Sequence, residues 1–226
     1  MPINYDIKSE VIDIKTDTPN SKDFFLVDTN VWYWLTYTRA SQATQRPSPY
    51  QLTTYTTYIK KALSSKSKLF TCGLSLPELA HLIEKTEYEI HIRSHQGINK
   101  KEYRYNYPSC RNGVVQEISA AWAQVAAMSE PLKVLINEPV TNCALKRLKT
   151  EFTDGYDVFI LEAIKQCKIL QVITDDGDYS SVSGIKLFTA KPEILRVAQQ
   201  QGKLVGRLNQ PPRVSATEKI RHLIGI

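Results

Sequence analysis

The stretch Phe24-Phe25-Leu26-Val27-Asp28-Thr29-Asn30 decides the fold of this chain. Its apolar residues predict a short buried strand, which ends at the carboxylate of Asp28. Residues 31–35 (VWYWL) then predict the first turns of a helix capped by Thr29 or Asn30. A buried strand that leads directly into a helix is typical of α/β proteins, so the same alternation is expected to recur along the chain.

The rest of the sequence does alternate in this way. Further strands are predicted at residues 68–72, 134–136, 169–174 and 185–188, and helices at 51–63, 75–83, 114–128, 140–151 and 158–164. We therefore expect a three-layer α/β/α sandwich with a central, mainly parallel sheet.

This domain is expected to span residues 24–190. An N-terminal extension would precede it at 1–23, and a basic C-terminal helix or tail would follow at 191–226. Within the domain, the polar loop at 38–50 and the basic, tyrosine-rich stretch at 91–112 are interpreted as insertions.

Composition limits the kinds of partner and setting. Lys and Arg number 29 against 23 Asp and Glu, a net charge of +6 that suits a nucleic-acid partner or simply a solvated basic face. The four cysteines form no C-x-x-C pair, which argues against zinc, and Cys72 and Cys167 are interpreted as buried thiols. Without an apolar leader or a membrane-length segment, the expected setting is the reducing cytoplasm.

Each notable acid has a structural role available when it is considered alone. Asp28 suits a helix N-cap, Ser75 and Glu78 have the spacing of a capping box, and Asp157 would favour a helix dipole. Aspartates are also common in turns, and the sequence crowds three of them after a late strand: Asp175, Asp176 and Asp178.

Considered together, the acids are harder to assign to structural roles. Parallel strands place their carboxyl ends at one edge of the sheet, where Asp28 and Asp175-Asp176 would meet. Like charges gathered there repel one another unless a cation joins them. Carboxylate ligands suit Mg²⁺ or Mn²⁺, so the sequence predicts a divalent-metal site at this edge.

Four stretches in order resemble the motifs of PIN-domain ribonucleases. They are the strand and acid of 24–30, residues 75–79 (SLPEL), residues 155–163 (GYDVFILEA) and residues 173–179 (ITDDGDY). The resemblance covers about residues 24–189, and no single motif is decisive without the others. It implies hydrolysis of RNA phosphodiester bonds by a metal-activated water, with no histidine required as base.

The resemblance also implies roles for individual residues. Asp28, Glu78, Asp157 and Asp176 would be catalytic, and one or two Mg²⁺ or Mn²⁺ ions would bind Asp28, Asp157 and Asp176, with Asp175 able to share the role. Asn30, Thr174 and Asp178 would support them by hydrogen bonds. A toxin-like member would have a cognate inhibitory (antitoxin) protein, and family members often form homodimers through a face such as 114–128.

The basic, tyrosine-rich stretch is a candidate RNA-binding segment. Its relevant residues are Lys100, Lys101, Tyr103, Arg104 and Tyr105. If the stretch is extended, its alternate tyrosines share one face and could stack on unpaired bases. The alternative is that these tyrosines pack on the core, as Trp32 and Trp34 are expected to do.

Other functions fit less well. A non-catalytic module that binds RNA or protein on the same scaffold remains the main alternative, although all four acids are present. A haloacid-dehalogenase-like phosphatase needs a D-x-D pattern after the first strand, and Asn30 occupies the second acid position. A phosphoacceptor receiver domain has no supporting pattern.

Overall fold

A computed structural model describes residues 3–133, 135–153 and 155–206. Within them, six strands form one sheet in which every pair is parallel, as the sequence predicts. The strand order is β1-β6-β5-β2-β3-β4. The strands are β1 (Glu10–Asp13), β2 (Phe24–Val27), β3 (Lys68–Cys72), β4 (Glu130–Leu132), β5 (Gln171–Ile173) and β6 (Lys186–Thr189).

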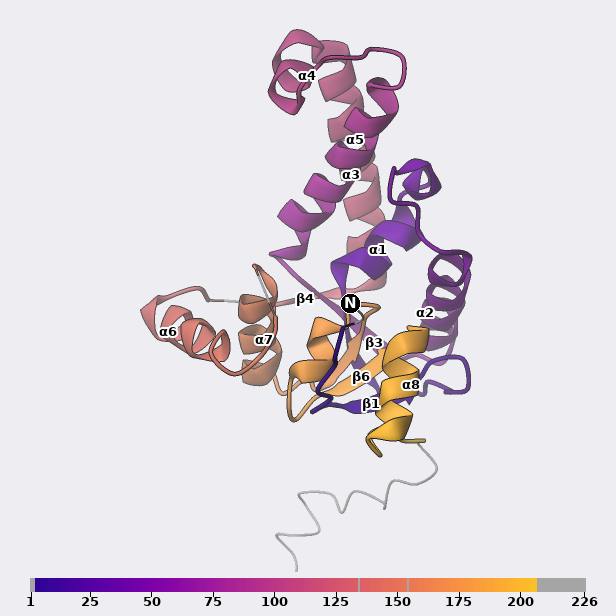
Figure 1. Cartoon of the computed structure of the whole chain (residues 1–226), viewed down its shortest axis with the longest axis vertical. Helices are drawn as coiled ribbons and strands as arrows, with labels where there is room; N and C mark the ends of the chain where they lie inside the picture. The colour runs from indigo at the N-terminus through magenta and orange to yellow at the C-terminus, as the bar shows by residue number, and fades with distance from the viewer. Residues whose placement is uncertain (1–2, 134, 154, 207–226) are drawn as a thin grey trace, which may run out of the picture.

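Helices cover both faces of the sheet and make the three-layer sandwich (Figure 1). One face carries α1 (Thr29–Thr36), α2 (Thr56–Ser64), α3 (Ser75–His91) and α5 (Pro108–Met128), and the other carries α7 (Asp157–Gln166) and α8 (Pro192–Gln200). Successive strand residues point to opposite faces. Phe25 and Val27 therefore join the first core, whereas Leu26 between them joins the second.

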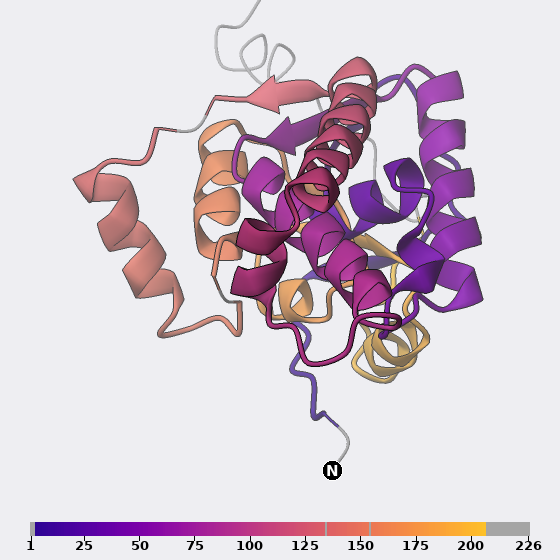
Figure 2. The same ribbon diagram turned by 90° about the horizontal axis from the view of Figure 1, so that it is seen from above.

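Two helical projections extend from this sandwich. Helices α3 and α5 rise together above the sheet with α4 (Lys100–Asn106) at their tip, and α6 (Glu138–Arg147) packs on α7 to one side (Figures 1 and 2). The apolar face of α5 lies mostly in the core, because Val114 and Val125 are buried and Trp122 packs against the first core. Much of the α5 face that was considered for a homodimer is therefore already covered by the rest of the same chain.

The expected insertions have regular structure in part. The stretch 91–112 forms α4 and the start of α5, and the loop 38–50 contains a short 3-10 turn at Ala40–Gln42. The helix expected from residue 51 begins with a π-helical turn at Gln51–Tyr55. The strand expected at 134–136 instead lies at β4, and Leu135 and Ile136 are exposed.

The segments outside residues 24–190 contribute to the core. Strand β1 comes from the expected N-terminal extension, and Ile7, Val11 and Ile12 are buried. Helix α8 buries Ile194 and Ala198 against the second core. The tail from residue 207 onward lies outside the described residues.

Cys72 is buried as predicted, but Cys167, at the C-cap position of α7, is exposed. No helix of the described residues is both long enough and apolar enough to cross a membrane.

Candidate active site

The order in which the chain adds strands to the sheet reverses between β2 and β5. From β2 the chain continues outward through β3 and β4, whereas β5 and β6 lie on its other side. In parallel sheets, such a switch point opens a crevice at the carboxyl ends of the strands, where ligands bind. Asp28 directly follows β2, and its backbone N–H donates to the Ile173 carbonyl of β5 at 3.0 Å.

The other predicted acids reach the same crevice from different elements. Asp176 follows β5, Glu78 lies in the first turn of α3, and Asp157 is the first residue of α7. Because α7 leads back into β5, its N-terminus lies at the carboxyl edge of the sheet. The topology therefore gathers residues that are as far apart in sequence as Asp28 and Asp176.

The electrostatics of Asp28 show that these acids are close to one another. Asp28 is only 5% exposed. Burial is the largest cause that raises its carboxyl pKa well above the ordinary value, followed by the charges of Asp157 and Glu78, with a smaller contribution from Asp176. A hydrogen bond from Thr174 opposes this rise in the pKa. All four predicted catalytic carboxyls therefore belong to one cluster.

Helix capping does not account for this cluster. Asp28 occupies the N-cap position of α1, where Thr29 or Asn30 was expected, and its side chain makes no capping hydrogen bond. Ser75 is already inside α3, whose N-cap is Leu74, and the predicted capping box with Glu78 does not form. Asp28 therefore does not stabilise its helix as a side-chain cap.

Thr174 links two members of the cluster. Its side chain is fully buried, and its hydroxyl donates to Asp28 Oδ2 at 2.7 Å. The Thr174 hydroxyl oxygen also accepts a hydrogen bond from the backbone N–H of Asp176 at 2.8 Å. Asp176 Oδ1 in turn accepts the backbone N–H of Asp178 at 2.9 Å, which places Asp178 in the turn beside the cluster.

Tyr179 is a further residue of the candidate site to which the sequence analysis gave no role. Its hydroxyl donates to Asp157 Oδ1 at 2.7 Å, and its ring is buried. Burial raises the pKa of this phenol well above its ordinary value, and the charges of Asp157 and Asp28 add to the effect. The only signal in the sequence was the aromatic residue that ends the motif at 173–179.

The tight approach of Tyr5 accounts for the glycine in this turn. A Cβ on Gly177 would lie 2.6 Å from Tyr5 Cε1 and 2.7 Å from its hydroxyl oxygen. The N-terminal segment therefore packs directly on the turn that carries Asp176, and only glycine leaves room for that contact.

The structure does not bring Asp175 into the cluster. Its carboxylate accepts hydrogen bonds from Gln51 Nε2 at 2.6 Å, from Tyr55 Oη at 2.8 Å and from Tyr50 Oη at 3.1 Å. Adjacent residues of extended chain point to opposite sides, so Asp175 faces away from Asp176. Asp175 holds the 50–55 segment against the sheet, which corrects the expectation that it shares a metal.

The predicted RNA-binding stretch is helical, so its residues do not share a face. Tyr103 is 3% exposed and Tyr105 is 76% exposed. Burial raises the pKa of Tyr103 to about 12. Arg104 is paired with Glu84. Lys100, Lys101 and Tyr105 remain accessible to a ligand, whereas Tyr103 packs in the projection, as the alternative interpretation held.

The donor set of the cluster suits a hard divalent cation. All four side chains offer carboxylate oxygens, which Mg²⁺ and Mn²⁺ prefer. Among the described residues, no three His, Cys, Asp or Glu side chains already form a ready-made metal cage. The chemistry of the donors and the raised pKa of Asp28 fit a cation.

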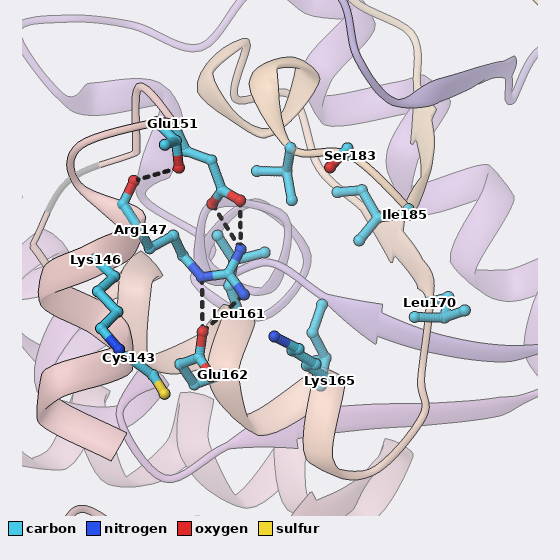
Figure 3. A pocket seen from close by; sticks show the side chains of 14 residues that line it. Cys143, Lys146, Arg147, Glu151, Leu161, Glu162, Lys165, Leu170, Ser183 and Ile185 are labelled. Atoms are coloured by element: carbon cyan, nitrogen blue, oxygen red, sulfur yellow. Dashed lines mark hydrogen bonds and ion pairs between the residues drawn. The ribbon is translucent and has the colours of Figure 1, made fainter. Parts of the chain in front are cut away.

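A cavity of about 600 Å³ lies elsewhere, between α6, α7 and the turn at 182–185 (Figure 3). None of the four acids lines it. Arg147 lines this cavity, and its guanidinium forms ion pairs with Glu151 at 2.6 Å and with Glu162 at 2.8 Å. All three side chains are nearly buried. This cluster ties α6 to α7 and therefore supports the helix that begins at Asp157.

The chain was also compared with known proteins. No protein-family model, curated protein or solved structure matches it.

Proposed function

We propose that this protein is a divalent-metal-dependent endoribonuclease that hydrolyses phosphodiester bonds of single-stranded RNA. The observation that carries the proposal is the gathering of Asp28, Glu78, Asp157 and Asp176 at the switch point of a parallel sheet. Burial and then the charges of the neighbouring acids raise the pKa of the Asp28 carboxyl, and a bound cation would offset this cost of ionisation.

Asp28, Asp157 and Asp176 would hold one or two Mg²⁺ or Mn²⁺ ions, and Glu78 would complete or orient the set. A bound ion would stabilise charge on the phosphate and lower the pKa of water. The protein itself would orient the carboxylates that hold the ion. Thr174 fixes the carboxylate of Asp28, and Tyr179 fixes that of Asp157. The first contact is buried and the second is partly buried, and both keep the carboxylates oriented before a substrate arrives.

The choice of RNA as substrate rests on the motif resemblance and on charge. The net charge is +6, and Lys100, Lys101 and Tyr105 at the tip of the α3–α5 projection are accessible to a polyanion with unpaired bases. The resemblance extends the proposal to a cognate inhibitory protein and to a homodimer, and free cysteines suit a reducing, cytoplasmic setting.

Cleavage of single-stranded RNA with Mg²⁺ or Mn²⁺ tests this function. Wild type, Asp28→Asn and Asp157→Asn should be compared with Asp6→Asn, a matched change at an exposed aspartate. We expect wild type and Asp6→Asn to cleave, both site variants to lose at least about 100-fold in rate, and EDTA to stop all cleavage. A folded wild type that binds RNA but cleaves none with either metal would contradict the proposal and favour a non-catalytic binding module. Equal cleavage by all four proteins would refute the site.

A further inference from the structure

A second cavity, of about 290 Å³, opens beside the acid cluster. Residues from α1, α3 and the 43–51 loop line it, and none of the four acids does. It nevertheless begins next to them. Asn30 of α1 lies two residues after Asp28, and Leu82 lies one helical turn after Glu78 on α3.

The walls of this cavity are fixed by hydrogen bonds. The backbone N–H of Thr44 donates to Glu89 Oε2 on α3 at 2.7 Å, and Gln51 Nε2 donates to Asp175 at 2.6 Å. Across the floor, the hydroxyls of Tyr33 and Thr86 are 2.7 Å apart. The loop that closes the cavity is therefore held at both ends, and the space is preformed.

The chemistry of the lining is that of a nucleotide site. Trp34 is half-buried, and its ring contacts Tyr55 with centroids 5.5 Å apart. Arg46 and Lys85 also line the cavity, and neither forms an ion pair among the described residues. An aromatic ring with flanking cations suits an unpaired base and its phosphates, whereas the amides of Asn30 and Gln51 can read a base edge.

We infer that this cavity is a nucleotide subsite that receives one unpaired base of the RNA beside the scissile phosphate. The base stacks on Trp34, and Arg46 and Lys85 contact the adjoining phosphates. This inference rests on the proposed ribonuclease function, and it assigns Trp34 to substrate although the sequence favoured a purely core role. A cavity of this size suits one nucleotide unit and excludes a duplex, which cannot present an unstacked base.

Binding without catalysis tests the subsite. Fluorescein-labelled A10 and U10 ribo-oligonucleotides, and a blunt RNA duplex of the same length, would be titrated with the full chain in EDTA, where no cleavage occurs. We expect the single strands to bind more tightly than the duplex. Trp34→Ala and Trp34→Leu should weaken single-strand binding about 10-fold, the range for loss of one stacked base.

Arg46→Gln provides a variant that cannot be confused with unfolding, because Arg46 is exposed. It should lower the slope of log Kd against log salt by about 0.7, the value for one phosphate contact on a single strand. The matched controls are Trp122→Ala on α5, also a half-buried tryptophan, and Lys60→Gln on α2, also an exposed cation. Both should bind RNA as wild type does.

The outcomes separate this inference from the proposed function. If wild type cleaves RNA but the Trp34 and Arg46 variants bind like wild type, the subsite is refuted and the nuclease stands. If those variants lose binding in EDTA while wild type cleaves nothing with metal, the subsite stands and the nuclease is refuted. Binding that is absent in wild type, or weakened equally by Trp122→Ala and Lys60→Gln, overturns the subsite.

Discussion

Asp28 is a residue of the candidate site whose charge is expected to destabilise the folded protein. Its carboxylate is buried, and the charges of Asp157, Glu78 and Asp176 raise its pKa further. A neutral amide of the same shape keeps an acceptor for the Thr174 hydroxyl but removes the repulsion. Functional groups that are unfavourable in the empty site are a recurring feature of binding centres.

We predict that Asp28→Asn keeps or raises stability in EDTA while losing its response to metal. Removing about 1 kcal/mol of repulsion would raise the melting temperature by about 2–4 °C in a chain of this size. Wild type should melt higher when Mg²⁺ or Mn²⁺ is added, because an ion that binds only the folded state stabilises it. Thermal melts with and without metal check this. The prediction would be contradicted if Asp28→Asn melted at a lower temperature than wild type in EDTA, or if metal raised its melting temperature as much as that of wild type.

The hydroxyl of Thr174 orients two of the acids, because it hydrogen-bonds to the Asp28 carboxylate and to the Asp176 backbone. Thr174→Val keeps the volume but leaves Asp28 Oδ2 and the Asp176 N–H without that partner. We expect RNA cleavage to fall about 10- to 100-fold, as for other groups that orient metal ligands, and Thr174→Ser to restore most of it.

A matched control for Thr174 is available on β3. The Thr71 hydroxyl is also buried but has no hydrogen-bond partner among the described residues. Thr71→Val should therefore leave cleavage unchanged and stability equal or higher. Equal losses of cleavage in the two valine variants would indicate a general packing effect and would argue against the positioning role of Thr174.

At the scale of elements, one carboxylate joins the three helices of the projection. Glu84 on α3 accepts Arg104 Nε of α4 at 2.6 Å and Arg111 Nη1 of α5 at 3.0 Å. Its side chain is 10% exposed, whereas the two arginines are nearly half exposed. The hydrogen bond from Arg104 is the largest cause that lowers the pKa of Glu84, and the charges of Arg104 and Arg111 lower it further.

This ion-pair cluster predicts a pH dependence of the projection. Because the folded pKa of Glu84 lies below the unfolded value of about 4.3, its contribution is present above that pH and is lost as pH falls through the folded pKa. At pH 7, Glu84→Gln should lower stability by about 1 kcal/mol, a figure reduced for the exposure of the arginines. In thermal melts at pH 7, 4 and 3, the difference in melting temperature between Glu84→Gln and wild type should become smaller as the pH falls.

An exposed ion pair serves as the control for Glu84. Glu130 and Lys68 lie 3.2 Å apart with both side chains more than half exposed, so Glu130→Gln should change little at any pH. Hydrogen exchange should locate the Glu84→Gln effect in α4. A difference that grows as pH falls would have the wrong sign for this interpretation.

At the scale of the whole molecule, both flanking segments complete the domain. Strand β1 pairs with β6, and the backbone of Val11 also bonds to Lys203 and Val205 beyond α8. The N-terminal segment further places Tyr5 on Gly177. This short strand is therefore held by β6 and by residues 203–205, and it contributes Val11 to the second core and Ile12 to the first. The segment before it supports the turn that carries Asp176.

Val11→Ala measures how far the domain depends on this segment. Val11 is fully buried, so we expect a loss of about 1–3 kcal/mol and a melting temperature lower by about 3–10 °C. Glu10→Ala on the same strand, at an exposed position, should be close to neutral. If residues 1–23 were a dispensable extension, both variants would melt like wild type.

The class of fold follows from the sequence alone, which also singled out the four acids that the fold brings together. Short apolar runs such as 24–27 can be placed without structure, because consecutive apolar residues at strand length are typical of a parallel strand that is covered on both faces. Weaker signals failed. β1 is four residues with only two fully buried side chains, and the 91–112 stretch has the composition of a loop although Asn99 and Glu102 form the capping box of α4.

Only the tertiary structure decided which neighbours share a site. Asp175 and Asp176 are adjacent in the chain, yet one binds Tyr50, Gln51 and Tyr55 while the other joins Asp28 across the switch point. Likewise, Trp32 is buried and Trp34 lines a cavity. Periodicity reports whether a residue is apolar and in which element it lies, but the direction of a side chain, and the partners it meets, depend on residues more than 100 positions away.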